Sequence, residues 1–333
     1  METSCDETAA AVVREGREVI SSVVSSQIEL HAAHGGVVPD LAARAHLEVI
    51  GPVVEEALSA LPGGWDGIDA VAVTRGPGLA GCLLVGVLYA ESAAVARGLP
   101  MVGVSHMAGH VYSAWISDVT LEPPYLALVV SGGHSDVVEL RGHGDARRLA
   151  STRDDAAGEA FDKAARLLGL GYPGGPAVES AALGGDPARF PLPRTRLDDA
   201  LSFSGLKTAL RYTIRDLGAD QLSDGGSPRD RAVVADLAAS FQAAVVEQLL
   251  HVLTTIADRR GAEQIAVVGG VAANQALRQA VRSQFAGLDV SIPPLSLCTD
   301  NAAMIGAAGW HRLQVHGPDE LGISVDPVLD EYA

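Results

Sequence analysis

Residues 126–140 read LALVVSGGHSDVVEL: an apolar run, a turn of small and polar residues, and a second apolar run. Short runs rich in Val and Leu on either side of such a turn are typical of two buried strands. A related order stands near the start of the chain, where polar residues 4–8 precede β-rich runs at 9–14 and 18–26. The repeat predicts two α/β lobes of similar architecture, although the two halves share little residue identity.

The segments after each strand pair continue the repeat. After the first pair we expect helices at 40–61, 79–97 and 106–115 and strands at 70–74 and 101–104. After the second pair we expect helices at 156–168, 230–257, 272–285 and about 300–315, and strands at 264–268 and 289–292. This order predicts a duplicated α/β fold with an N-terminal lobe over 1–120, a C-terminal lobe over 121–333, and a cleft between them.

The composition indicates a substantial core and a strong acidic charge. Of 333 residues, 48% are hydrophobic and only 20% are charged, which excludes a disordered or fibrous chain, and the formal net charge is −17. The longest apolar run, 79–90, is shorter than the roughly 18–20 residues that span a bilayer. Three cysteines are too few for a disulfide framework. We therefore expect a soluble, cytoplasmic protein that does not enter a membrane.

A Gly- and Pro-rich insertion without a long periodic segment is expected at about 169–226. Its stretch 189–215 has a local charge of +4, from six basic residues and two acidic ones: Arg189, Arg194, Arg196, Lys207, Arg211 and Arg215 against Asp198 and Asp199. On so acidic a chain, this stretch is the best candidate to face a polyanion. The alternative is a solvated loop with scattered arginines.

Several glycine-rich turns carry different weight. Gly76, Gly78 and Gly81 match G-x-G-x-x-G, but no acidic residue ends the next strand, so a dinucleotide site is disfavoured. The turns at 131–134 and 269–274 directly follow apolar strands, and 172–176 adds a third constrained backbone segment. Such turns let backbone N–H groups approach an anion or a purine. Together they favour nucleotide binding over three simple strand exits.

Two histidines stand at helical spacing. His106 and His110 are four positions apart, so both can face one metal ion. The metalloprotease pattern H-E-x-x-H is missing its glutamate, which disfavours hydrolytic zinc chemistry. The third ligand is left open among Asp6, Glu7 and Asp300, and two histidines without a metal remain the alternative.

An acidic stretch opens the helix expected at 156–168. Asp155, Glu159 and Asp162 lie three or four positions apart on one face. Compensation of the helix dipole and contact with a ligand are equally consistent with this pattern.

Eight motifs in order resemble the TsaD family of tRNA N6-adenosine threonylcarbamoyltransferases. They are 2–8 (ETSCDET), 106–110 (HMAGH), 130–134 (VSGGH), 154–163 (DDAAGEAFDK), 172–176 (YPGGP), 202–207 (SFSGLK), 269–274 (GGVAAN) and 298–301 (CTDN). The resemblance runs essentially end to end. It implies an actin/Hsp70/sugar-kinase type of fold, called ASKHA, with a nucleotide cleft.

The resemblance also implies an activity and its partners. The family transfers a threonylcarbamoyl group from threonylcarbamoyl-AMP to N6 of the adenosine 3′ of the anticodon in tRNAs that read ANN codons, and releases AMP. Companions are a TsaB-like paralogue and a TsaE-like ATPase, and a TsaC-like enzyme supplies the donor. A strongly acidic chain needs such companions, or a local basic patch, to hold tRNA.

The resemblance further implies which residues form the site. His106, His110 and Asp300 match the ligands of one metal ion per subunit, usually iron, with zinc or another divalent metal as alternatives. The adenylate-binding positions correspond to Val129, Val130, Ser131, Gly132, Gly133, Asp162, Gly175, Glu179 and Asn274. Family members vary at the position of Glu179. Our hypothesis for the acceptor amine is that Asp6 or Glu7 assists its deprotonation.

Two departures and three alternatives accompany the resemblance. Family members usually have several apolar residues before the first motif, whereas this chain begins Met1-Glu2, and many relatives have Glu where Ala108 stands. A non-catalytic scaffold of the same fold would lack the histidine pair and Asp300. A metal-dependent endopeptidase would need the missing glutamate. A small-molecule kinase of the shared fold would convert ATP to ADP.

Overall fold

The computed structural model describes residues 1–218, 222–223, 225–228 and 230–332, and these form two compact units. Unit 1 comprises Met1–Tyr125, Glu139–Arg147 and Pro293–Ala333. Unit 2 comprises Leu126–Val138 and Arg148–Ile292. The expected lobe boundary at 120 is close to Tyr125, where the chain first passes from unit 1 into unit 2. The expectation that all of 121–333 forms the second lobe is wrong, because the C-terminal segment packs into unit 1.

Unit 1 contains four strands and several helices. The strands are β1 (Glu7–Arg14), β2 (Glu18–Ser26), β3 (Val71–Gly76) and β4 (Met101–Ser105). The helices are α1 (Ile28–Ala32), α2 (Pro39–Leu58), the 3-10 turn η1 (Gly64–Gly67), α3 (Ala80–Arg97), α4 (His106–Ser117), α10 (Leu295–Cys298) and α11 (Ala302–His316).

The first residues join the two strand pairs of unit 1. Strand β1 pairs antiparallel with β2, and β3 pairs parallel with β4. Glu2 exchanges backbone hydrogen bonds with Ala9 of β1, and Met1 bonds with Ala72 and Thr74 of β3. Met1 and Glu2 therefore link β1 to β3.

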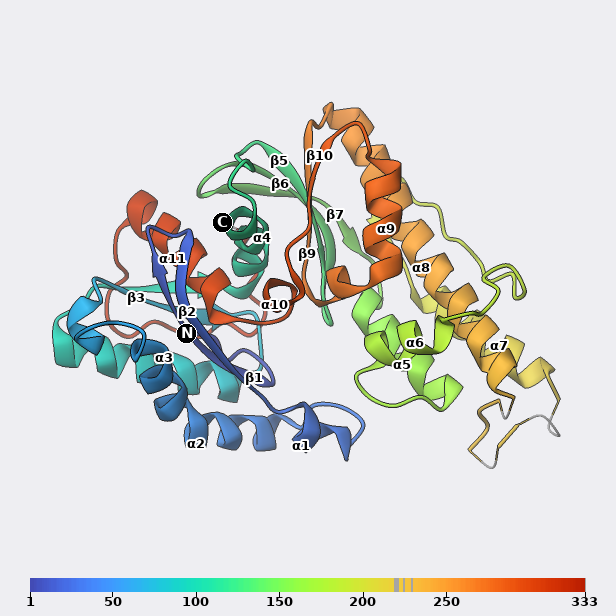
Figure 1. The fold of residues 1–333 in the computed structure, drawn as a ribbon, viewed down its shortest axis with the longest axis horizontal. Coiled ribbons are helices and arrows are strands. Elements are labelled where there is room, and N and C mark those ends of the chain that lie inside the picture. Colours follow the sequence, from blue (N-terminus) through green and yellow to red (C-terminus); the bar gives the residue numbers. More distant parts are fainter. Residues whose placement is uncertain (219–221, 224, 229, 333) are drawn as a thin grey trace. The chain divides into compact units, whose positions relative to one another are not determined.

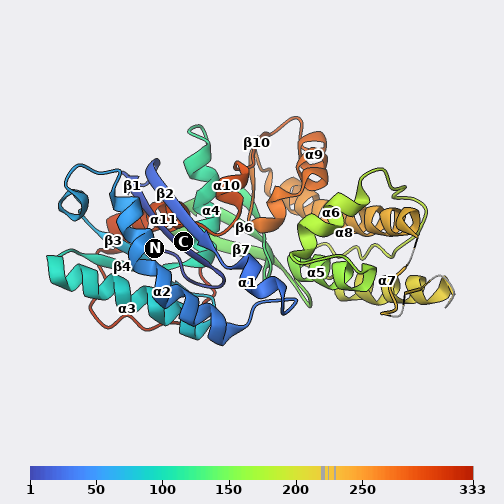
Figure 2. The same ribbon diagram turned by 60° about the horizontal axis from the view of Figure 1, so that its bottom comes forward.

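Alternating side chains place helices on both faces of these strands (Figures 1 and 2). On β1, Ala10 and Val12 pack with α2, whereas Ala11 and Val13 pack with the cluster formed by α4 and α11. This period of two is expected for strands covered on both faces. Close packing of α11 on the strands explains why a C-terminal helix belongs to unit 1.

Unit 2 holds most of a six-stranded sheet in the order β10-β9-β5-β6-β7-β8. The strands are β5 (Tyr125–Val130), β6 (Ser135–Gly142), β7 (Asp145–Thr152), β8 (Ala200–Leu201), β9 (Gln264–Val268) and β10 (Asp289–Ser291). The helices are α5 (Ala157–Leu168), α6 (Gly174–Ala182), α7 (Ser204–Asp216), α8 (Arg231–Arg260), the 3-10 turn η3 (Gly270–Ala273) and α9 (Gln275–Gln284).

Most expected elements are present, with three corrections. The helix expected at 272–285 is split into η3 and α9, because Asn274 has an extended backbone and caps α9. The insertion is not free of periodic segments: it contains α6 and α7. Strand β7 was also missed. Residues 219–221 and 224 of the insertion lie outside the described residues.

Two helices are long and apolar enough to cross a membrane by length and composition, α3 and α8. Most of the apolar window of α8 is buried within the protein, and α8 packs on α6 and α9. Helix α3 packs on α2 and β3. The core helices of soluble proteins pass the same test, so these two helices are weak indications of a membrane segment.

Candidate functional site

The two histidines lie on the first turn and a half of α4. Strand β4 is buried throughout and ends at Ser105, whose hydroxyl accepts hydrogen bonds from the backbone N–H groups of Met107 and Ala108. This cap starts the helix at His106. The rings of His106 and His110 therefore lie one turn apart, with centroids separated by 4.6 Å.

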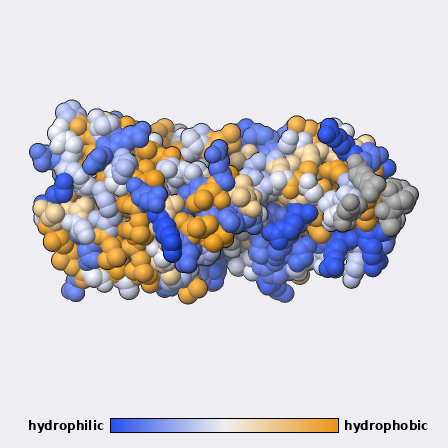
Figure 3. All heavy atoms as spheres, turned by 90° about the horizontal axis from the view of Figure 1, so that it is seen from below, coloured by the Kyte–Doolittle hydropathy of each residue, from blue (hydrophilic) through white to orange (hydrophobic). Residues whose placement is uncertain are grey.

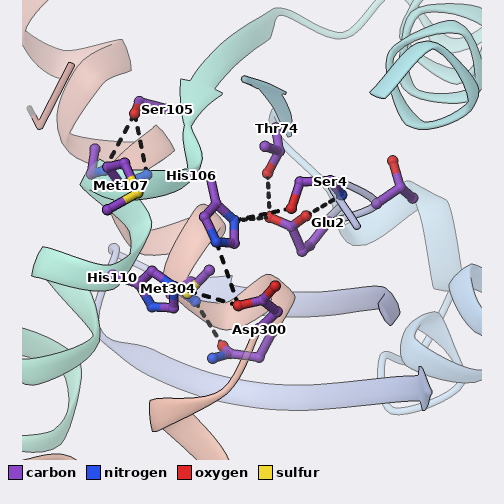
Figure 4. A network of polar contacts seen from close by, with 12 residues as sticks. Glu2, Ser4, Thr74, Ser105, His106, Met107, His110, Asp300 and Met304 are labelled. Atoms are coloured by element: carbon purple, nitrogen blue, oxygen red, sulfur yellow. Dashed lines mark hydrogen bonds and ion pairs between the residues drawn. The ribbon is translucent and has the colours of Figure 1, made fainter. Parts of the chain in front are cut away.

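Asp300 approaches both histidines from a different part of unit 1 (Figure 4). Its Oδ1 lies 3.4 Å from Nε2 of His106 and 3.4 Å from Nε2 of His110. Asn301 caps α11 and so places Asp300 just before that helix. Close packing of α4 on α11 requires a small residue, since a Cβ at Gly109 would lie 2.7 Å from Ile305 Cδ1. The helix packing thus brings the carboxylate to the imidazoles.

These three residues fit a divalent metal ion. Their ligand atoms all lie within 4.8 Å of one another, and they form the one such group among the described residues. His110 is fully buried, yet its Nδ1 has no hydrogen-bond partner within the described part of the chain, and its Nε2 faces only the carboxylate of Asp300 there. Buried polar atoms normally have partners, and two imidazoles with one carboxylate are a common ligand set for Fe or Zn. Asp300, among the three carboxylates left open by the sequence, lies with the histidines.

The charges in this group favour an ionised carboxylate. Burial opposes ionisation of Asp300, but the charge and hydrogen bonds of the histidines outweigh it and lower the pKa of Asp300. Burial lowers the pKa of His110. For His106, burial acts the same way, but Asp300 and Glu2 together raise the pKa above its ordinary value.

Glu2 is part of this network and was not singled out from the sequence. It is fully buried, and its Oε2 lies 2.9 Å from His106 Nδ1. The hydroxyl of Thr74 also donates to Oε2, at 2.6 Å. Its signal in the sequence was its place at the start of the motif 2–8.

Asp6 and Glu7 lie at the turn that enters β1. The carboxylate of Glu7 accepts a hydrogen bond from the hydroxyl of Ser26. Burial, followed by the nearby charges of Asp300 and Asp6, raises the pKa of Glu7 to about 9. Burial and the neighbouring carboxylates therefore favour the neutral form of the Glu7 carboxyl.

In unit 2, the Ser-Gly-Gly turn after β5 is held by the start of α5. The backbone N–H groups of Gly158 and Glu159 donate to the carbonyls of Ser131 and Gly132. A Cβ at Gly158 would lie 2.6 Å from the Ser131 oxygen, so only glycine permits this approach. Gly132 and Gly133 themselves face open space, because an added Cβ at either would contact nothing within 4 Å.

Further hydrogen bonds connect the other predicted adenylate-binding residues of unit 2. Asp162 Oδ1 accepts from the N–H of Gly174, at the start of α6, and Glu179 on α6 accepts from the N–H of Gln275, at the start of α9. Asn274 caps α9 and donates to Gln242. Strand β9, which precedes η3 and Asn274, pairs with β5 through Val268 and Val129. The structure thus brings together these motifs, whereas the predicted metal ligands lie in unit 1.

The basic stretch of the insertion is partly neutralised. Arg189 pairs with Asp236 and Arg194 pairs with Glu247, both on α8. Lys207 and Arg211 on α7 form no ion pair with any other described residue. Next to them, Tyr212 is 52% exposed, and the guanidinium of Arg215 lies over its ring. Arg215 itself pairs with Asp216, so the unpaired cations of this stretch are Lys207 and Arg211 on α7 and Arg196 before it, as far as the described residues show.

Comparisons with known proteins agree with the motifs. The family model "TsaD: tRNA N6-adenosine threonylcarbamoyltransferase" matches residues 18–307. A tRNA N6-adenosine threonylcarbamoyltransferase of Anaeromyxobacter dehalogenans is 49% identical over 336 residues, covering 98% of this chain and 97% of the relative. The enzyme of the same name from Thermomicrobium roseum is 49% identical over 352 residues, covering 100% and 94%.

Solved structures with low sequence identity share the fold. Full-length HypF in its phosphate- and nucleotide-bound form matches with a TM-score of 0.61 at 13% identity, over 96% of this chain and 56% of HypF. The activator of 2-hydroxyisocaproyl-CoA dehydratase from Clostridium difficile matches with a TM-score of 0.53 at 12% identity, over 94% and 92%. These similarities confirm the ASKHA type of α/β fold. With the sequence matches and the ordered motifs, they establish that the chain is a transferase of the TsaD family of tRNA N6-adenosine threonylcarbamoyltransferases.

Proposed function

We propose that the chain transfers the threonylcarbamoyl group of threonylcarbamoyl-AMP to N6 of the adenosine 3′ of the anticodon in tRNAs that read ANN codons. The observation that carries this proposal is the group formed by the buried His106 and His110 and the partly exposed Asp300, in a chain of this family. The amine nitrogen attacks the carbamoyl carbon, the bond from that carbon to the phosphate oxygen breaks, and AMP leaves with the bonding electrons. The N6 proton passes to a base.

His106, His110 and Asp300 would hold one iron ion per subunit, with zinc or another divalent metal as alternatives. When bound, such an ion supplies a Lewis acid that polarises a donor oxygen. Because AMP is already a good leaving group, the residues of the chain mainly have to orient the donor and exclude water. No protein nucleophile is required.

The adenylate part of the donor would lie on unit 2, against the turn of Ser131, Gly132 and Gly133. The two glycines leave room for close approach of a phosphate or a purine, as does Gly175. Asp162, Glu179 and Asn274 already have partners within unit 2, so their first role is to hold the segments around this surface.

Asp6 and Glu7 are the candidates for proton transfer from the acceptor amine. The raised pKa of Glu7 favours its neutral carboxyl, which would donate a hydrogen bond to the substrate, and Asp6 is then the candidate to accept the proton. Single-turnover rates of Asp6→Asn and Glu7→Gln test this assignment. Full rates in both variants contradict it.

For tRNA, the contact surface that we favour is the exposed side of α7, with Lys207, Arg211, Tyr212 and Arg215. Exposed cations bind phosphates, and an exposed aromatic ring can stack on an unpaired base. These charges alone are few for a chain of net charge −17. Companion proteins, a TsaB-like paralogue and a TsaE-like ATPase, would supply the rest, while a TsaC-like enzyme would make the donor in the same cytoplasm.

A surface of unit 1 supports a protein companion. Leucines on α2 and α3 are exposed, namely Leu47 (65%), Leu84 (45%) and Leu88 (58%). Hydrophobic side chains gather over these helices in Figure 3. A paralogue of the same fold, with helices of its own, would cover this face.

The deciding experiment is a single-turnover assay with threonylcarbamoyl-AMP, unmodified tRNA and the companion proteins, read by mass spectrometry of the nucleosides. We expect modified adenosine with the wild type and none with His110→Ala. If the folded, complexed wild type yields no product, the non-catalytic scaffold becomes the better interpretation. The missing H-E-x-x-H glutamate disfavours an endopeptidase.

A further inference from the structure

The carboxylate of Glu2 has three hydrogen-bond partners. Two of them, the N–H of Ser4 and the hydroxyl of Thr74, are donors, and the third is Nδ1 of His106, which also lies 3.3 Å from the hydroxyl of Ser4. The backbone N–H of Ser4 donates to Oε1 at 2.5 Å. The hydroxyl of Thr74 donates to Oε2 at 2.6 Å, and His106 Nδ1 lies 2.9 Å from the same oxygen. Glu2 and Thr74 are fully buried. The side chain is therefore held from both ends, as Figure 4 shows.

This arrangement determines which nitrogen of His106 is available. An ionised carboxylate only accepts hydrogen bonds, so Nδ1 of His106 must carry a proton. When the imidazole is neutral, its free electron pair is then on Nε2, the atom that faces Asp300. We propose that Glu2 is a positioning residue that fixes the tautomer and orientation of His106 as an Nε2 ligand. The inference rests on the metal site of the proposed function.

The second histidine shows that this support is specific to one ligand. Nδ1 of His110 has no hydrogen-bond partner among the described residues, although it is buried. His106 is held by the carboxylate of Glu2 on its far side, whereas among the described residues the one carboxylate next to His110 is that of Asp300, on the Nε2 side. Carboxylate partners of this kind raise the basicity of a metal-binding imidazole.

An amide at position 2 cannot replace the carboxylate. A glutamine has one acceptor oxygen and one NH₂ group. If its oxygen faces His106 and Thr74, its NH₂ faces the N–H of Ser4. If its oxygen faces Ser4, its NH₂ faces Nδ1 and favours the tautomer with a proton on Nε2. In either orientation one buried donor loses its acceptor, although the side chain keeps its size.

The test measures metal affinity on the full chain, independently of activity. Zn²⁺ binding is determined by competition with a chromophoric chelator for the wild type and Glu2→Gln, and Fe²⁺ binding likewise without oxygen. We expect Glu2→Gln to weaken binding by about 10–100-fold. Ser21→Ala is the matched control, since it removes a partly buried side-chain hydrogen bond in the same unit, to the carbonyl of Ala57. Circular dichroism checks that all variants are folded.

A double-mutant cycle separates positioning from simple charge. If Glu2 acts through His106, the effect of Glu2→Gln on the dissociation constant disappears in a His106→Ala background. The same loss in both backgrounds overturns the proposal, because Glu2 would then act only as a nearby negative charge. An unchanged dissociation constant in the single variant overturns it too.

A second readout addresses folding and the parent proposal. In ¹⁵N-histidine spectra, we expect a protected Nδ1-bound proton of His106 in the wild type and Thr74→Val, and in Glu2→Gln either its loss or its faster exchange with solvent. Its absence in the wild type contradicts the hydrogen bond and the inference. If the wild type binds neither metal, the proposed metal site fails and this inference with it. If it binds metal and Glu2→Gln binds equally well, only the inference fails.

Discussion

Units 1 and 2 present their candidate binding groups in opposite ways. In unit 1 the group consists of side chains, and the buried Nδ1 of His110 lacks a hydrogen-bond partner among the described residues. In unit 2 the polar side chains of Asp162, Glu179 and Asn274 already bond within the fold, and what stays open is the backbone at glycines. In unit 1, substitutions of these side chains should therefore lower ligand affinity without lowering the stability of the fold. In unit 2, the same result is expected only for substitutions of the open glycines.

The largest effect is expected for Asp300→Asn. The variant loses the one charged metal ligand of the proposed site, which lies next to both imidazoles. Metal affinity should therefore fall by more than the roughly 10–100-fold that is typical when a residue bonded to a ligand is replaced. Chelator competition and single-turnover product measure the loss. Asp319→Asn is the matched control, because Asp319 is a unit 1 carboxylate bonded to Arg312 and to the N–H of Gly103. Equal metal affinity in Asp300→Asn and the wild type would show that the group is not a metal site.

Two substitutions in unit 2 test the contrast directly. Gly133→Ala should lower AMP affinity about tenfold, or about 1.4 kcal/mol, and leave the melting temperature unchanged, because its Cβ meets no neighbour. Asp162→Ala should lower stability by about 1–3 kcal/mol, since the N–H of Gly174 loses a charged acceptor. Calorimetry measures both quantities. Gly287→Ala, another open glycine of unit 2, is the control. Unchanged AMP binding in Gly133→Ala would remove the turn from the proposed donor site.

A smaller effect is expected on α7. Arg211→Ala should weaken tRNA binding several-fold and reduce the dependence of log affinity on log salt by about 0.7–0.9, the value for one lost phosphate contact. Arg189→Ala removes the same charge from a residue paired with Asp236 and should change binding less. Filter binding in the presence of the companion proteins at several salt concentrations compares them. If log affinity depends on log salt equally in both variants, α7 is not the tRNA contact surface.

The smallest effect concerns a second histidine pair in unit 1, His143 and His311, whose rings stack with centroids 3.7 Å apart. Burial, then the charges of His143 and Arg17, lower the pKa of His311 to about 3. Between pH 6.5 and 3 the unfolded chain therefore binds more protons, so stability falls as pH falls through this range. In His311→Phe, the melting temperature should fall by a few degrees less than in the wild type over the same pH range. If the melting temperatures of the two proteins change equally with pH, the lowered pKa of His311 is contradicted.

Much of the fold was predictable because strand and helix periods are local. The alternation on β1 and the four-residue spacing of His106 and His110 are visible in the sequence. Helix α7 was also visible, through Leu206, Leu210 and Ile214 at one buried face, but the glycines around it concealed the pattern. Strand β7 was missed because its charged residues gave little apolar signal.

The site was predictable in its ligands and unpredictable in its surroundings. The four-residue spacing of His106 and His110 predicts that both lie on one face of a helix. Which carboxylate is the third ligand, Asp300 and not Asp6 or Glu7, depends on the packing of α11 on α4. The role of Glu2 depends on a contact with His106 across 104 positions. The division into units was misjudged for the same reason, since local patterns cannot show that the last helix returns to unit 1.

The return of α11 to unit 1 also sets an order of events during synthesis. His110 leaves the ribosome 190 positions before Asp300, and all of unit 2 is made in between. The core of unit 2 can therefore form first, before Asp300 is available to the two histidines of α4. Ser105, whose hydroxyl caps α4, donates to the carbonyl of Glu331 as well. The two histidines therefore gain their full set of neighbours only when the final residues of the chain have been translated.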